Sequence, residues 1–130
     1  MVTHRLKFRC LTGKYAVCRL PAKSSVPPWA SRGDGFSSIT RADDELSIVC
    51  LIENLPDEHR QEIQWTCFKL EGPFSFSAVG VLHSFITPLA QAEIPIFALS
   101  TYDTDYVLVR DVDAERATEA LQRAGHHLIS

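Results

Sequence analysis

The sequence predicts an α+β protein whose second half follows the ferredoxin-like order βαββαβ, and three observations carry this prediction. Residues 64–70 alternate polar and apolar side chains, as a half-buried strand does. Apolar residues then recur at three- and four-residue spacing from Val79 to Ala90, which is typical of an amphipathic helix. Two strand-like runs, 94–100 and 106–109, precede a second amphipathic segment. This order favours an antiparallel sheet with both helices on one face.

The ends of the two predicted helices carry recognisable signals. Ser77 is the expected N-cap of the first helix, and Pro88 within its pattern predicts that the helix bends or breaks there. The second helix begins near Asp111 and ends at Gly125, which suits the left-handed residue that follows many helices. Residues 127–129 then form a short closing strand.

The first half of the chain is predicted to consist of strands with little helix. Residues 5–10 and 15–20 flank Gly13, a turn residue, and we expect them to pair as a hairpin. Residues 5–10 alternate roughly between polar and apolar side chains, as a strand with one buried face does.

The remainder of this half contains two further strands. Residues 36–41 and 46–52 are joined by the acidic stretch 42–45, which has turn chemistry. The prolines and glycines of residues 21–35 leave room for at most one short helical turn. The half therefore resembles a degenerate copy of the unit that follows it. We predict two domains, 1–62 and 63–130.

Composition limits the classes of partner. The formal net charge of −3 argues against general nucleic-acid binding, which needs a basic surface for phosphates. No apolar run is long enough for a membrane helix, and no apolar core of a signal peptide follows the first residues. We therefore expect a cytoplasmic protein with neither nucleic acid nor membrane as a partner.

The cysteines and histidines do not form a recognisable metal motif. No C-x-x-C pair is present, so we expect structural thiols, no metal site and no cofactor. The adjacent His126 and His127 are better explained by capping of the C-terminus of the second helix than by metal binding. The four cysteines are Cys10, Cys18, Cys50 and Cys67.

Two segments of the second half, 78–85 and 88–109, carry a family resemblance, and the run STYDTDYVLV at 100–109 is their most specific part. They resemble the ACT family, in particular short bacterial ACT proteins related to the animal arginine sensors with four such modules. Residues 13–17 and 36–40 match the degenerate leading module of these proteins more weakly.

The resemblance implies a binding site and an assembly. ACT modules bind amino acids or other small metabolites, usually where two modules pair, so a homodimer is expected. The pattern departs at Tyr102, where an animal sensor can have Phe, and it does not carry over the identity of the ligand. The implied contacts lie at the entry to the first helix and at the end of the next strand: Gly80, Val81, Ser100, Thr101, Tyr102 and Asp105.

The same residues suit a zwitterion on chemical grounds. Backbone N–H groups around residues 78–81 can bind a carboxylate, and Gly80 lets the ligand approach the backbone closely. Asp103 or Asp105 can hold an ammonium group, and Tyr102 offers an aromatic wall for a cation.

Each of these features also has a structural reading. Residues 103–105 could simply form a turn, Gly80 could reflect helix packing, and the hydroxyls of Ser100 and Thr101 could satisfy the edge of the sheet.

The sequence therefore favours a non-catalytic, allosteric regulatory protein that binds an amino acid and acts on a protein partner. The alternative is a structural or protein-interaction subunit without a ligand. An enzyme on this scaffold ranks last, because only Asp103, Asp105 and His83 could serve it as a base or nucleophile.

Overall fold

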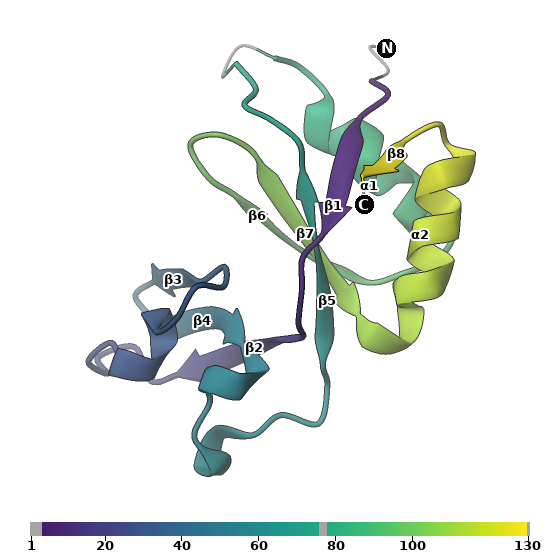
Figure 1. Ribbon diagram of the computed structural model, residues 1–130. Coiled ribbons are helices and arrows are strands. Elements are labelled where there is room, and N and C mark those ends of the chain that lie inside the picture. The colour runs from purple at the N-terminus through teal and green to yellow at the C-terminus, as the bar shows by residue number, and fades with distance from the viewer. Residues whose placement is uncertain (1–3, 76–77, 130) are drawn as a thin grey trace. The chain divides into compact units, whose positions relative to one another are not determined.

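The computed structural model describes residues 4–75 and 78–129, which fall into two compact units (Figure 1). The two-helix unit combines residues up to Thr12 with those from Thr66 onward, and the three-strand unit comprises Gly13–Trp65. The predicted N-cap, Ser77, lies outside the described residues.

The two-helix unit contains the βαββαβ order that the sequence predicts. Its strands lie in the order β6-β7-β5-β1-β8, and α1 and α2 pack their apolar sides into one hydrophobic cluster on the sheet. The ferredoxin-like α+β prediction is therefore confirmed. The elements are β1 (Lys7–Cys10), β5 (Trp65–Leu70), α1 (Val81–Gln91), β6 (Ile96–Ser100), β7 (Asp105–Arg110), α2 (Ala114–Arg123) and β8 (His127–Ile129).

Strand β1 is not part of the hairpin that the sequence predicts. It pairs antiparallel with β5, placing Phe8 opposite Leu70, and parallel with β8, placing Phe8 opposite Leu128. The hairpin prediction is wrong because a turn residue such as Gly13 indicates where the chain can reverse, not which strand it will pair with. Burial of Phe8 in the core beside β5 favours the distant partners instead.

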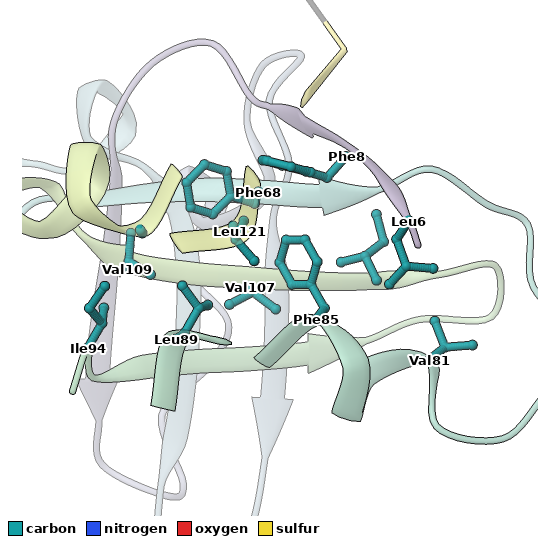
Figure 2. Close-up of a cluster of buried hydrophobic side chains, with 12 residues drawn as sticks. Leu6, Phe8, Phe68, Val81, Phe85, Leu89, Ile94, Val107, Val109 and Leu121 are labelled. Atoms are coloured by element: carbon teal, nitrogen blue, oxygen red, sulfur yellow. The ribbon is translucent and has the colours of Figure 1, made fainter. Parts of the chain in front are cut away.

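The core of the two-helix unit is an aromatic and aliphatic cluster between the sheet and the helices (Figure 2). Phe8, from β1, makes edge-on ring contacts with Phe68 at 5.5 Å and with Phe85 of α1 at 5.3 Å between ring centroids. All three rings are almost completely buried. Such ring pairs add to the stabilisation that burial itself provides.

Helix α1 passes through Pro88 without ending there, and it runs from Val81 to Gln91. A proline has no N–H, so the carbonyl four residues earlier, that of Ser84, lacks its helical donor. His126 supplies one, with Nε2 lying 2.9 Å from the oxygen of Ser84. The sequence suggested that the His126 side chain caps the end of α2, but its imidazole instead satisfies a carbonyl in the neighbouring helix.

Helix α2 ends as the sequence predicts. Gly125 has a φ of 99°, in the left-handed region, and the N–H of His126 bonds the carbonyl of Leu121 at 3.1 Å. Glycine is required at such a position because it has no Cβ to clash with the preceding turn.

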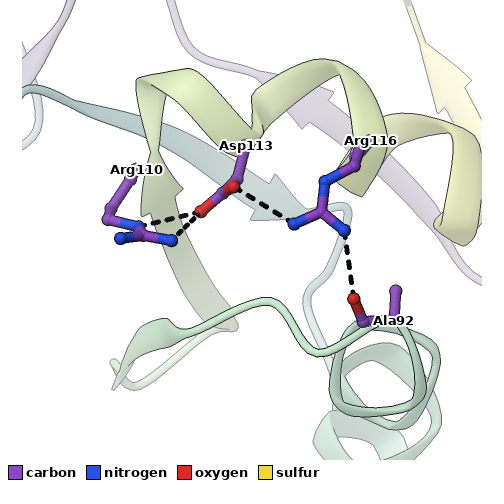
Figure 3. Close-up of polar contacts among 4 residues, drawn as sticks. All are labelled: Ala92, Arg110, Asp113 and Arg116. Carbon is purple, nitrogen blue, oxygen red and sulfur yellow. Dashed lines mark hydrogen bonds and ion pairs between the residues drawn. The ribbon is translucent and has the colours of Figure 1, made fainter.

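A buried carboxylate ties the start of α2 to the end of α1 (Figure 3). Asp113 is 6% exposed and accepts from Arg110 at 2.8 Å and from Arg116 at 3.2 Å. Arg116 also donates to the carbonyl of Ala92, just beyond α1, at 3.1 Å. Burial alone would raise the pKa of Asp113, but the hydrogen bonds and charges of the two arginines outweigh it and hold the pKa below its ordinary value.

Asp113→Asn should destabilise the fold at neutral pH by about 1 kcal/mol, since both arginine partners are partly exposed. The lowered pKa means that this contribution is complete above the ordinary aspartate pKa and is lost as the pH falls through the native value. Urea denaturation at pH 7 and in steps from pH 5 downward would measure it. A stability difference that persists in acid would contradict the ion-pair explanation.

The three-strand unit is a small antiparallel sheet in the order β3-β4-β2, comprising β2 (Tyr15–Leu20), β3 (Ser38–Arg41) and β4 (Leu46–Leu51). The predicted helical turn is a 3₁₀ helix at Pro28–Ser31, whose Trp29 packs into the core of the unit. The sequence-based expectation that the first half of the chain is a degenerate copy of the second half stays a prediction. The other 3₁₀ helices of the chain are Ile52–Asn54, Asp57–His59 and Asp111–Asp113.

Three of the four cysteines are buried among apolar side chains, and Cys10 is exposed. Burial raises the pKa of the Cys67 thiol to about 12 and that of Cys50 to about 11. Thiols held in their protonated form are poor nucleophiles and metal ligands, so these cysteines act as small apolar side chains.

Candidate functional site

A cavity of about 420 Å³ lies in the two-helix unit, where the start of α1 meets the hairpin between β6 and β7. The cavity is lined by all seven site residues that the sequence analysis predicted. From the α1 side and the hairpin these are Gly80, Val81, Ser100, Thr101, Tyr102, Asp103 and Asp105. The other lining residues include Ala78, which the sequence analysis counted among the backbone donors, and His83, which it considered only as a base for an enzyme. Sequence reasoning did not select the remaining four, which are Phe74, Ser75, Leu82 and Thr104.

The α1 side of the cavity presents backbone donors. Gly80 precedes the helix with a φ of 79°, a left-handed conformation that strains any residue with a Cβ. The first bond of the helix joins the N–H of Ser84 to the carbonyl of Gly80 at 2.9 Å. The N–H groups of Val81, Leu82 and His83 therefore precede the helical ladder, and they carry the positive end of the helix dipole.

The opposite side of the cavity is the tip of the β6–β7 hairpin. Ser100 lies opposite Asp105 in the strand register, and its Oγ donates to Oδ1 of Asp105 at 2.5 Å. The backbone N–H of Thr101 donates to the carbonyl of Thr104 at 2.8 Å, and its Oγ1 donates to the same carbonyl at 3.1 Å. The hydroxyls thus stabilise the turn, as the structural reading anticipates, and Asp105 keeps its second carboxylate oxygen for another partner.

The hairpin tip is held against the end of β5. Thr104 donates its hydroxyl to the carbonyl of Leu70 at 2.8 Å, and the carbonyl of Asp103 accepts the N–H of Phe74 at 3.0 Å. A Cβ added at Gly72 would lie 2.9 Å from the oxygen of Asp103, so only glycine allows this approach. The position of the acidic turn is therefore set by the segment that follows β5.

The lining side chains make the cavity acidic. Among the described residues that line it, Asp103 and Asp105 are the carboxylates, His83 is the single basic side chain, and there is no lysine or arginine. Tyr102 is 79% exposed, so its ring stands at the rim. Two carboxylates facing a row of backbone donors can bind a ligand that is anionic at one end and cationic at the other.

No metal-binding group of three or more His, Cys, Asp or Glu side chains occurs within residues 4–75 and 78–129. In the same part of the chain, no helix has the length and apolar character needed to cross a membrane.

Two family models match the chain. A model described as an ACT domain matches residues 61–123, and a model described as an N-terminal domain matches residues 13–58. The two matches lie in the second and the first half of the chain, respectively.

One curated protein and two solved structures are similar to the chain. A bovine protein named cytosolic arginine sensor for mTORC1 subunit 1 is 30% identical over 99 residues, which are 68% of this chain but 30% of the sensor. The crystal structure of protein Atu0741 from Agrobacterium tumefaciens is 46% identical with a TM-score of 0.88, and the match covers 98% of this chain and 94% of that one. The structure of VC0802 from Vibrio cholerae, 22% identical with a TM-score of 0.71, covers 88% of this chain and 85% of its own and shows the fold alone.

Proposed function

The chain belongs to the ACT-domain family through residues 61–123, and on this premise we propose that it is a non-catalytic regulatory protein that binds a free amino acid. The observation that carries the proposal is the acidic cavity between the first turn of α1 and the β6–β7 hairpin. It combines backbone donors on one side with carboxylates on the other, which is the complement of a zwitterion.

The proposed pose follows from the two sides of the cavity. The carboxylate of the ligand accepts from the N–H groups at the start of α1, and its ammonium group binds the second oxygen of Asp105. Asp103 and the ring of Tyr102 also line the cavity, and they can contact a cationic side chain of the ligand. A basic amino acid therefore suits the site best, and the relationship to an arginine sensor makes L-arginine the first ligand to test.

The proposed output is allosteric regulation in the cytoplasm. The protein is proposed to form a homodimer and to alter the activity of a protein partner when the ligand binds, without cofactor, nucleic acid or membrane. A ligand that binds only the native state also stabilises that state by mass action, which makes binding measurable without knowledge of the partner.

A thermal-shift screen of the twenty amino acids and common nucleotides tests this function. L-arginine at a hundred times its dissociation constant should add about 2.7 kcal/mol of stability, which raises the melting temperature of a protein of this size by several degrees. Lysine should bind more weakly than arginine because a compact ammonium cannot reproduce the forked hydrogen bonds of a guanidinium. Glutamate should not bind.

The second candidate is a protein-interaction subunit without a ligand. It is favoured by the hydroxyls of Ser100 and Thr101, which already have partners inside the hairpin. A screen in which none of the compounds changes the melting temperature, together with a stable partner in purification, would support this candidate and reject the amino-acid proposal.

A further inference from the structure

Two histidines connect the segment before β1 to the first turns of α1. The N–H of Leu6 donates to Nδ1 of His126 at 3.1 Å, so the imidazole proton of His126 is on Nε2, which donates to the carbonyl of Ser84. His126 is 4% exposed, and its ring lies against Phe85 with the ring centroids 5.4 Å apart. The segment at Leu6 is thereby joined to α1 through one buried imidazole.

His4 makes the second connection, closer to the cavity. Its backbone N–H donates to Oγ of Ser84 at 3.1 Å. Its Nε2 lies 2.7 Å from the carbonyl oxygen of Val79 and must donate there, because a carbonyl has no proton to give. Val79 immediately precedes Gly80, which lines the cavity.

The bond from His4 restrains the peptide unit between Val79 and Gly80. In a trans peptide the C=O and the N–H point in opposite directions, so a carbonyl directed at His4 turns the N–H of Gly80 away from it. Gly80 is the residue at which this peptide could otherwise rotate most freely, since glycine occupies a wide range of backbone angles. The hydrogen bond from the His4 imidazole therefore restricts the rotation of the Val79–Gly80 peptide that the glycine would otherwise allow.

We propose that His4 is a positioning residue of the cavity: by holding the carbonyl of Val79 it fixes the Gly80 peptide and the donors at the start of α1 for an incoming carboxylate. The inference rests on the proposed function for the nature of the ligand. It extends the site to a segment about 75 positions away in sequence that does not line the cavity. His126 and Ser84 provide the frame on which this segment is anchored.

The first experiment compares three variants of His4 in the full chain, with L-arginine as the probe. His4→Ala removes the donor and should weaken binding about fivefold, which is the effect of losing one hydrogen bond that orders the site. His4→Gln should restore binding because its amide N–H₂ can reach the same carbonyl, whereas His4→Phe should not, since it keeps a ring without a donor. Isothermal titration measures the affinities, and His127→Ala, which removes an exposed ring from β8, is the matched control.

The second experiment needs no ligand. Amide hydrogen exchange in His4→Ala should increase at Ser84 and Phe85, in the first turns of α1, and His4→Gln should restore it. Exchange at Leu121 in α2 should stay as in the wild type, which distinguishes local positioning from general destabilisation.

The outcomes separate this inference from the proposed function. If the wild type does not bind L-arginine but exchange at Ser84 changes as expected, the positioning role of His4 holds and the ligand proposal fails. If the wild type binds and His4→Ala binds equally well, the role of His4 is rejected while the ligand proposal stands. Unchanged exchange at Ser84 in His4→Ala would also overturn the inference.

Discussion

Asp105→Asn is expected to remove most of the stabilisation that L-arginine gives to the wild-type protein. Asp105 shares one carboxylate oxygen with the hydroxyl of Ser100 and keeps the other for the ammonium group of the ligand. A hydrogen bond between charged groups contributes about 1.5–3 kcal/mol, so its loss should weaken binding by at least about tenfold. The amide of asparagine still accepts from Ser100, and the unliganded variant should therefore melt within a few degrees of the wild type.

Two further variants test whether the effect of Asp105→Asn comes from the loss of this particular carboxylate. Asp43→Asn removes an exposed carboxylate from the turn between β3 and β4 and should leave binding unchanged, because it removes the same negative charge without touching the cavity. Ser100→Ala should weaken binding less than Asp105→Asn, since it frees the carboxylate without removing it. Equal arginine affinity in the wild type and in Asp105→Asn would exclude the proposed ammonium contact.

Phe8→Ala should cause a large loss of stability in the two-helix unit, of about 3–5 kcal/mol. Phe8 is fully buried and makes ring contacts with Phe68 of β5 and Phe85 of α1. Its removal leaves a void among rings that cannot close around an alanine. Because a domain of ordinary stability has about 5–15 kcal/mol in total, this one substitution should remove a large share of it. Urea denaturation followed by circular dichroism would measure the loss.

The same variant tests the partner of β1. If β1 pairs with β5 and β8 as the structure shows, Phe8→Ala should reduce hydrogen-exchange protection at Phe85 and Leu121, which lie in the same hydrophobic core. If residues 5–10 instead paired with 15–20 in a local hairpin, protection in α1 and α2 would not change. Lys7→Ala is the matched control on the same strand, because its exposed side chain should contribute no more than about 0.5 kcal/mol.

The local features of the sequence determined the elements of the two-helix unit and their order. Alternation in residues 64–70 and the helical spacing from Val79 to Ala90 predict β5 and α1, because burial of one face imposes a period on each type of element. Gly125 marks the end of α2 because its left-handed φ is a local requirement.

The seven predicted site residues line one cavity for a similar reason. Most of them lie in a single hairpin tip, where sequence neighbours remain neighbours in space, and the remainder begin the helix that the order βαββαβ places beside it. The resemblance to a known family selected these segments, since turn chemistry alone gives the same residues a purely structural role.

Only the tertiary structure decided the partners of β1 and the contacts of His4 and His126. Gly13 indicated a turn, but the burial of Phe8 between β5 and α1 depends on residues distant in sequence. Leu6 and His126 meet although they are 120 positions apart, and the carbonyl of Ser84 needs His126 because Pro88 removes its helical donor. A periodic pattern records which face of an element is buried, whereas the partner that satisfies a polar group is determined by the packing of the whole unit.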